Sequence, residues 1–559
     1  MSRLLVMRHV YVVPILTIVF AFGIEGSPAF GQLAGGGLSD SGYAIGGTSV
    51  RDTVSSLLAG PTTSTVRPWT FSGDVDVEVG ATDSPGGIGR GGWQPVILVA
   101  PDFILNGVTS RLNVALAYSP RLAFYPSTSS QTLLSQSFNG SATAVLVPDL
   151  LYITARGISD VSSRFGNTSL LSNSFVSRSE AVQTSSFSVS PYLQRTIGGY
   201  GTVTAGYSYS QTFQDSDNQF NNNYFAPNAG QLAGFGTTGN LQTNTEFGSY
   251  TTGENLGRIQ NVISGTASQY SGSFYYQGAS TFSVSDRLSY ELYRWLTVFG
   301  TVGYQDYNYP RSGFSLSQPT WSLGVTLSPN ETSSITVQYG QIAGIDTVLA
   351  NGSYSPTPRT RVYGSYTVDI QTGLGARQGL LGTTGVGPGG ILLDNLTGSP
   401  TLANTYLASQ SPLSRVKALT VGGALLLDRD TFTVTVGRSE FEQLGGSVSI
   451  LGVATSTGTR TDTLYSSLNW QHDLNPSTSL SSGLSYAQSN NGVFYGSPGS
   501  SQDTLQLYTS LNHVLTDTLS TSVSFSHSER FGDATRNLPA AFGGSASQNT
   551  FLVGLRKSF

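Results

Sequence analysis

Apolar and polar residues alternate with a period of two along most of this sequence. In TLQLYTSLNHVL (504–515) every second position from 505 is mostly leucine, and the positions between carry Thr, Gln, Ser and Asn. TLSTSVSFSHS (518–528) and RLNVALAYSPRLAFY (111–125) repeat the pattern. A period of two places alternate side chains on opposite faces of a β-strand. The sequence therefore predicts an all-β protein whose strands have one apolar and one polar face.

The connections between these strands alternate between short and long. The short ones are 106–108, 147–150, 197–201, 292–296, 328–332, 355–359, 428–430, 473–477 and 515–519. The long ones lie near 161–184, 215–279, 372–414, 442–460, 489–502 and 530–548. This alternation is typical of a transmembrane up-and-down antiparallel barrel with periplasmic turns and extracellular loops, whereas a sandwich mixes loop lengths. Counting hairpins, with a first strand near Thr70–Ala81, predicts about 20 strands, within a range of roughly 16–22.

The N-terminus has the layout of a secretory signal peptide. Arg3 and Arg8 precede an apolar run from Val10 to Phe22, and the small-residue stretch Ala29–Gly31 predicts cleavage before residue 32. An apolar run of about 13 residues is shorter than the roughly 20 that a spanning helix needs. The chain has no cysteine, which excludes a lipid anchor on cysteine, disulfides and thiolate metal sites. We predict a signal peptide over 1–31, export, and a barrel over 69–559 in the outer membrane.

Composition argues against other classes of protein. The residues after 31 carry 25 basic and 31 acidic side chains, so the predicted mature chain is mildly acidic and gives no basis for nucleic-acid binding. Charged residues make up 11% of the whole chain, and its 28 Tyr and 27 Phe are too many for a disordered protein. The polarity comes from Ser, Thr, Asn, Gln and Gly. Low charge with many aromatic residues fits a barrel that faces lipid.

The chain ends on the amphipathic stretch NTFLVGLRKSF (549–559). Phe551, Val553, Leu555 and Phe559 share one parity. Resemblance to known outer-membrane barrels implies that the barrel-assembly machinery reads the terminal Phe559. That resemblance makes the assembly machinery and outer-membrane lipid the expected partners.

QPVILVAPDFILNGVTSRLNVALAYSPRLAFY (94–125) resembles the N-terminal strands of the outer-membrane beta-barrel porin family, some of whose members belong to extracellular-polysaccharide export systems. The hairpins LSPNETSSITVQYG (327–340) and LNPSTSLSSGLSYAQ (474–488) are similar to later strand pairs of that family. The resemblance covers most of the chain after the signal peptide, but it rests on strand patterns. It implies a barrel and a pore, and it carries no catalytic residues over.

Several side chains are predicted to line the lumen, because they lie on the polar parity of their strands. They are Arg111, Arg121, Arg361, Asp369, Tyr363 and Tyr508. Arginine is permanently charged, so these residues either bias ion selectivity or pair with lumenal Asp and Glu in a structural ladder. The tyrosines either stack on sugar rings or fill the wall.

Three further segments bear on whether the lumen is open. Residues 32–68 contain TSVRDTVSSLLAG (48–60), which is either a flexible periplasmic tail or a short helix at the barrel mouth. The long stretches 215–279 and 372–414 either fold inward or stay exposed. About 20 strands enclose more space than wall side chains fill.

Catalytic chemistry has little support in the sequence. His527 and Glu529 share one face, but Ser526 and Ser528 lie on the other, so no nucleophile lies beside its base. Metal-ligand spacings and phosphate-binding loops are absent from the sequence, so we predict no enzyme, metal or cofactor. Two functions remain: a porin-like channel for polar or neutral solutes, which includes an exit pore for a secreted polysaccharide, and a structural or adhesive barrel with a closed lumen.

Overall fold

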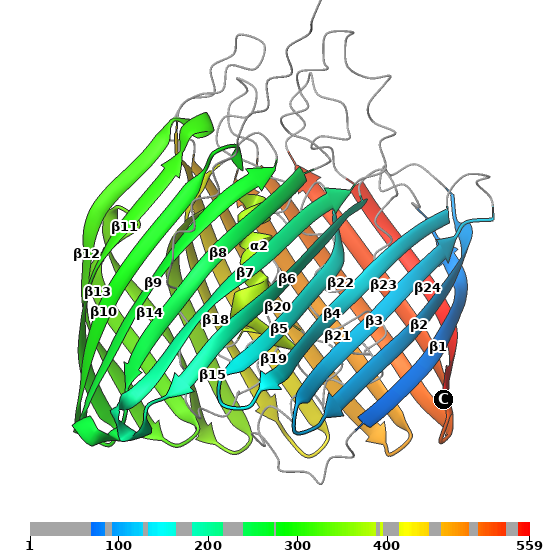
Figure 1. Ribbon diagram of the computed structural model, residues 1–559. Helices are drawn as coiled ribbons and strands as arrows, with labels where there is room; N and C mark the ends of the chain where they lie inside the picture. Colours follow the sequence, from blue (N-terminus) through cyan, green and yellow to red (C-terminus); the bar gives the residue numbers. More distant parts are fainter. Residues whose placement is uncertain are drawn as a thin grey trace, which may run out of the picture.

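The computed structural model describes residues 69–83, 92–126, 132–163, 181–215, 239–272, 276–386, 392–394, 413–445, 460–490, 501–532 and 546–559. Twenty-two antiparallel strands form one sheet that closes on itself into a barrel, with the strands tilted relative to the barrel axis (Figure 1). Each strand pairs with the next one along the chain, and β1 pairs with β24 in register from Asp74↔Ser558 to Thr82↔Thr550. The predicted all-β, up-and-down antiparallel barrel is confirmed.

The barrel strands are long enough to cross a bilayer at a tilt. Their bounds are β1 (Trp69–Thr82), β2 (Gln94–Val108), β3 (Leu112–Phe124), β4 (Thr132–Val147), β5 (Leu151–Ser163), β6 (Ala181–Thr196), β7 (Gly201–Asp215), β8 (Gly239–Thr252), β9 (Ile259–Gly272), β10 (Ser280–Tyr293), β11 (Leu296–Tyr309), β12 (Phe314–Asn330), β13 (Ser333–Ile342), β14 (Ile345–Thr357), β15 (Thr360–Gln371), β18 (Ser414–Leu426), β19 (Asp430–Gln443), β20 (Arg460–Asn475), β21 (Thr478–Asn490), β22 (Ser501–Thr516), β23 (Leu519–Gly532) and β24 (Ala546–Ser558).

The smaller elements lie between barrel strands. They are the helix α2 (Gly373–Thr383), the hairpin of β16 (Thr384–Val386) and β17 (Leu392–Asp394), and the 3-10 turns η1 (Gly198–Tyr200), η4 (Glu254–Leu256) and η6 (Pro310–Ser312). Within the described residues, no helix combines the length and the apolarity that crossing a bilayer requires.

The strand number corrects the prediction of about 20. The stretch 215–279, expected to be one long loop, contains β8 and β9 as a further hairpin, which brings the barrel to 22 strands. The alternation of β8 is hidden because its outward positions near the long-loop end are polar: Asn240, Gln242, Asn244 and Glu246. The turn between β8 and β9 contains Gly257 at φ +61°, a conformation that glycine adopts without strain.

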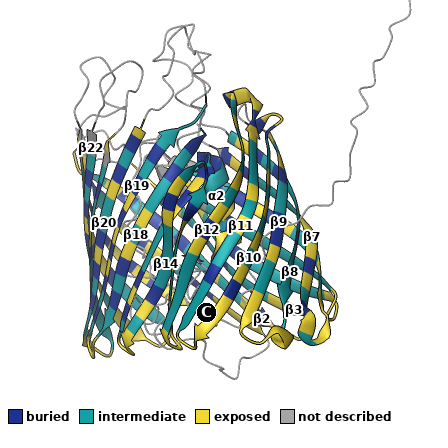
Figure 2. Ribbon diagram, turned by 90° about the vertical axis from the view of Figure 1, so that its left-hand side faces the viewer, coloured by how far each residue is buried: buried dark blue, intermediate teal, exposed yellow. Residues whose placement is uncertain are grey.

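Buried and exposed positions alternate along many strands (Figure 2), and the two faces of the wall are inverted relative to a water-soluble protein. On β23 the outward Val523 and Phe525 are 40% and 38% exposed, whereas the inward Ser522 and Ser524 are 3% and 7% exposed. The same division holds along most strands, with large apolar side chains outside and Ser, Thr, Asn and Gln inside. An exposed apolar belt around a closed barrel is the surface expected of a wall that faces lipid.

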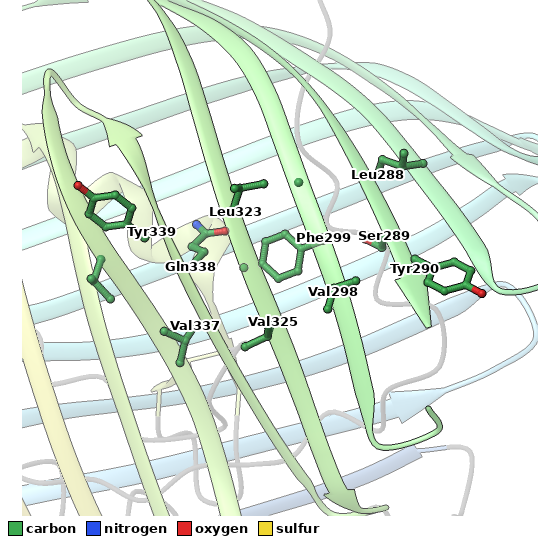
Figure 3. A pocket seen from close by; sticks show the side chains of 13 residues that line it. Leu288, Ser289, Tyr290, Val298, Phe299, Leu323, Val325, Val337, Gln338 and Tyr339 are labelled. Carbon is green, nitrogen blue, oxygen red and sulfur yellow. The ribbon is translucent and has the colours of Figure 1, made fainter. Parts of the chain in front are cut away.

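The outward surface also carries a shallow apolar groove over β10–β14 (Figure 3). Its volume is about 600 Å³, and outward side chains such as Leu288, Leu323 and Tyr339 line it. These three side chains are 55%, 64% and 50% exposed, so the groove belongs to the lipid-facing surface and not to the lumen.

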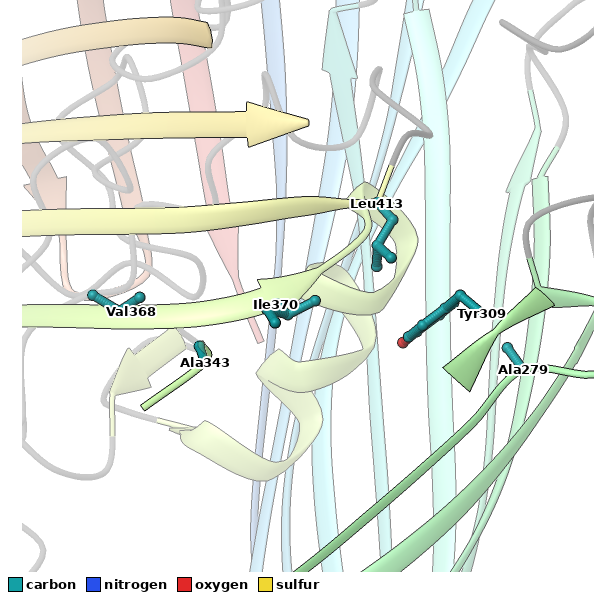
Figure 4. Packing of buried hydrophobic residues seen from close by; sticks show 6 residues of the cluster. All are labelled: Ala279, Tyr309, Ala343, Val368, Ile370 and Leu413. Carbon is teal, nitrogen blue, oxygen red and sulfur yellow. The ribbon is translucent and has the colours of Figure 1, made fainter. Parts of the chain in front are cut away.

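The wall is irregular where β14 meets β15. The two strands pair only between Ala350↔Tyr366 and Thr357↔Thr360, so β15 separates from β14 beyond Tyr366. Val368 and Ile370 have the parity of the lipid-facing Val362, yet both are buried in an apolar cluster that extends to Leu413 and Tyr309 (Figure 4). The upper end of β15 therefore stays paired with β18, and an apolar cluster takes the place of pairing with β14.

Candidate functional site

The lumen is lined by short polar side chains that bond to one another across the strands. Ser186 and Thr212 share a hydrogen bond of 2.8 Å, and Asn469 donates to Thr433 at 3.2 Å. Such bonds between neutral groups make much of the wall polar without adding charge. Against this background, two features of the lumen differ: a helix that enters it and a cluster of charges at the closing seam.

The helix α2 follows β15 but packs against β6, β7 and β8. Those strands stand seven to nine positions away from β15 in the barrel order, so this segment crosses the interior (Figure 1). The described part of 372–414 therefore folds inward, as one of our two sequence-based alternatives proposed. The helix lies near the long-loop end and narrows the lumen there (Figure 2).

A small set of contacts holds α2 in place. Thr243 of β8 donates to the side chain of Gln378 at 2.5 Å, and the hydroxyls of Tyr276 and Thr372 bond to each other. Leu374 is buried in a cluster with Leu241 and Tyr276. Burial raises the pKa of the Tyr276 hydroxyl, which therefore remains protonated and available as a donor. Thr372 also accepts the Gly375 N–H at 3.0 Å and so caps the first turn.

The second feature lies where the barrel closes. Asp74, Asp76 and Glu78 occupy successive inward positions of β1 and are 6%, 8% and 2% exposed. Arg556, on β24, stands opposite Asp76 in the register and donates to Asp74 Oδ2 at 2.5 Å. Both partners of this ion pair are almost fully buried.

Two further charges come from β2 and β3. Asp102 stands opposite Asp74 in the register of β1 and β2. Arg121 of β3 interacts electrostatically with Asp76 and Glu78 but makes no hydrogen bond or ion pair within the described residues. We call these six residues the seam cluster: Asp74, Asp76, Glu78, Asp102, Arg121 and Arg556.

Four of the predicted lumen residues lie on inward faces of the wall. Arg361 is 2% exposed and donates to Ser353 at 3.1 Å. Tyr363, on the same face, shares a hydrogen bond of 3.0 Å with Thr435. Tyr508 is 2% exposed on β22. Arg121 belongs to the seam cluster. A role of the tyrosines in sugar stacking stays a prediction.

The other two predicted lumen residues are placed differently. Arg111 lies in the turn between β2 and β3, where its N–H faces Thr109 Oγ1 at 3.4 Å and its side chain is exposed at the barrel end. Asp369 lies on the upper part of β15, which pairs with β18 but not with β14, and its carboxylate accepts the Ile370 N–H at 2.7 Å. The structure therefore does not bring Arg111 and Arg121 together, nor Arg361 and Asp369.

Sequence reasoning missed the three carboxylates of β1. The signal was present in GDVDVEVG (73–80), where acidic residues occupy three successive positions of one parity. The pairing of the first strand, β1, with the last strand, β24, places Arg556 beside these carboxylates. No local sequence pattern reveals that contact.

The histidines have polar partners other than serine. His472 contacts Asp430 at 2.9 Å, His513 contacts Thr478 at 2.9 Å, and His527 contacts Asn549 at 2.8 Å. In the described part of the chain, no three His, Cys, Asp or Glu side chains converge on a point that would hold a metal ion.

No protein-family model and no curated protein matches the chain. Solved structures of siderophore receptors and of an iron transporter are similar. The ferric enterobactin receptor of Pseudomonas aeruginosa has a TM-score of 0.41 and 10% identity over 88% of this chain and 80% of that chain. The siderophore receptor PirA of the same organism has a TM-score of 0.38 and 14% identity over 89% and 82%. The FrpB iron transporter of Neisseria meningitidis has a TM-score of 0.38 and 8% identity over 87% and 82%.

The resemblance to the beta-barrel porin family holds only as far as the closed antiparallel barrel. Membership in that family has no support from a family model, and a link to polysaccharide export has none from the solved structures. The terminal Phe559 is 80% exposed, and its N–H donates to the Gly73 carbonyl at 2.8 Å, beside the closing seam. Its role as an assembly signal stays a prediction.

Proposed function

We propose that this chain is an outer-membrane channel for small polar or charged solutes, with a lumen that α2 narrows. The observation that carries the proposal is the inverted wall: 22 strands enclose a polar interior and present an apolar belt outside. A barrel of that size encloses more space than wall side chains can fill. A polar interior of this width is suited to water and hydrophilic solutes.

The outward surface of β18 to β20 supports a membrane location. Leu419 and Val421 are 43% and 47% exposed on the outward face of β18, and the next outward residues toward the long-loop end are Lys417 and Arg415. Lys417 pairs with Glu440 at 3.1 Å, and Arg415 pairs with Glu442 at 2.8 Å. A band of ion pairs directly beyond an apolar band is the change expected where hydrocarbon gives way to headgroups and water.

The position of α2 favours a regulated or restricted channel over a wide one. The contacts that join the helix and its first turn to the opposite wall include two side-chain hydrogen bonds and an apolar cluster. Export of a polysaccharide would require this segment to leave the lumen, whereas small solutes would pass beside it. The exit-pore role remains a more specific prediction.

Conductance in planar bilayers tests the proposal. The wild-type protein should give stepwise openings, and a variant with residues 373–383 replaced by an 11-residue Gly–Ser linker should give larger ones. Heat-modifiable mobility on gels serves as the folding control for both proteins. Absence of conductance from two correctly folded proteins would favour the closed structural or adhesive barrel.

A further inference from the structure

We propose that Asp76 and Glu78 of the seam cluster form a cation-binding row that makes the channel selective for cations. The proposal rests on the channel function proposed above and names the solute class that the lumen prefers. Asp74 and Arg556 act as the structural part of the cluster, because they form a close buried ion pair. Asp76 and Glu78 form no such pair with any residue in the described part of the chain.

The first argument is the state of the buried polar atoms. Among the residues that the structure describes, Asp76 Oδ1 and Glu78 Oε2 are buried and have no hydrogen-bond partner. Within the same residues Ser119 Oγ also has none, and Ser119 is only 1% exposed. Ser119 lies on the inward face of β3, and the flanking pairs Val99↔Leu122 and Phe103↔Tyr118 place it beside Asp102. A buried carboxylate without a donor costs free energy that a cation would recover.

The second argument is the space that the backbone leaves for the carboxylates. Gly554 of β24 stands opposite Glu78 in the register. A Cβ at position 554 would come within 2.9 Å of Glu78 Cγ and 3.3 Å of Asp76 Oδ1. The absence of a side chain at 554 therefore allows both acidic side chains to lie over the neighbouring strand, on the inward face.

The third argument is the balance of charge. The seam cluster has four carboxyl groups and two guanidiniums, so its acidic groups outnumber its basic groups by two. Charges that water does not surround are screened weakly, so their field reaches farther into the lumen than that of exposed side chains. The field of the cluster attracts cations and repels anions.

The arrangement points to mobile singly charged or amine cations and not to a chelated metal. No three potential metal ligands converge within the described residues. Asp74, Asp76 and Glu78 instead follow one another at every second position of β1, so they form a row along the strand. A row of carboxylates offers a cation several weak binding sites in succession. Such sites favour passage of the cation along the lumen over its retention at one point.

The test measures reversal potential in a potassium chloride gradient across a planar bilayer. The wild type should pass potassium in preference to chloride. Asp76→Asn combined with Glu78→Gln should lower the permeability ratio several-fold, because a change of about 1 kT in local potential alters the cation-to-anion ratio by about sevenfold. Asp74 and Arg556 are left in place so that the seam still closes.

A matched control neutralises two carboxylates on the outward face. Asp286 of β10 accepts a hydrogen bond from Asn261, and Asp306 of β11 accepts one from Ser317. Asp286→Asn combined with Asp306→Asn removes the same charge without touching the lumen and should leave the ratio unchanged. Glu78→Gln alone, a milder change, should give an intermediate ratio.

The outcomes separate this proposal from the channel function. No conductance from the wild type or from the variant lacking α2 would overturn the channel itself. Conductance with anion selectivity, or with a ratio that the Asp76 and Glu78 changes leave unaltered, would overturn the cation row and keep the channel. An equal effect of the outward control would also overturn it, because net charge and not position would then be responsible.

Discussion

Breaking the buried ion pair at the closing seam should destabilise the barrel strongly. Arg556→Met keeps most of the side-chain volume but removes the only hydrogen-bonded cationic partner that the structure gives Asp74, and both residues of the pair are over nine-tenths buried. Removing one member of a buried pair costs about 3–5 kcal/mol, because a charge is left buried without compensation. Here the cost should lie near the upper end, since Asp76 and Glu78 are close by.

The double variant Asp74→Asn, Arg556→Met should recover most of that loss. It removes both charges, and replacing a buried pair by neutral groups is often close to neutral in free energy. We expect the free energy of unfolding of the double variant to lie within about 1–2 kcal/mol of the wild-type value. Lys557→Met, at the next position of β24, is the matched control: Lys557 is exposed and donates to Thr518 at 2.6 Å, so its loss should cost about 1 kcal/mol or less.

The assay is urea-induced unfolding of the refolded proteins in lipid vesicles, followed by tryptophan fluorescence and by gel mobility without heating. The reasoning would be refuted by an Arg556→Met protein as stable as the Lys557→Met control. It would also be refuted by a double variant no more stable than the single one, because Asp74 would then not carry the uncompensated charge.

Three other predictions follow from the faces and contacts of the wall. Cysteines at Ser520 and Ser526 should react with water-soluble thiol reagents in intact outer membranes, whereas a cysteine at Val523 should be shielded by lipid; uniform labelling would contradict the assignment of faces. Leu374→Ala should raise the mean single-channel conductance, because losing about 2–5 kcal/mol of buried contact loosens α2; unchanged conductance would show that α2 does not restrict the path. Deleting Phe559 should lower the yield of folded protein in the outer membrane more than it lowers refolding yield in detergent, and equal losses would contradict an assembly role.

The sequence predicts the faces of most strands correctly, because the alternation of apolar and polar residues is a local property. A wall with lipid on one side and a polar lumen on the other requires that alternation in each strand. It fails at β8, where the outward Asn240, Gln242 and Asn244 remove the apolar parity. Tyr207 donates to Asn244 at 2.6 Å, so polar side chains satisfy one another on the outward face there. A strand without an apolar face looks like a polar loop, and the hairpin is therefore missed.

The prediction of faces also fails at the upper part of β15, for the opposite reason. Val368 and Ile370 continue the outward parity, and the pattern predicts that they face lipid. They are buried instead, because β15 separates from β14 and packs in a cluster that includes Tyr309 of β11 and Ala343 in the turn between β13 and β14. The pairing of strands, and not the local pattern, decides which side of a barrel a residue sees, and pairing depends on contacts far apart in the sequence.

The contrast between seams explains why the charged cluster is best understood as functional. Along β21 to β23 the inward positions are filled by Ser, Thr and Gln, such as Ser485 and Gln506, which bond across the strands at 3.4 Å. That arrangement closes a wall with neutral groups and leaves few polar atoms without a hydrogen bond.

The seam between β1 and β24 instead places three carboxylates in a row, and oxygens of Asp76 and Glu78 have no hydrogen-bond partner among the described residues. A seam selected only for stability would avoid that cost, because the chain shows a cheaper arrangement on its neighbouring strands. Positions where a chain departs from its usual stabilising arrangement concentrate at functional sites. Here the row of carboxylates makes the electrostatic potential inside the lumen negative.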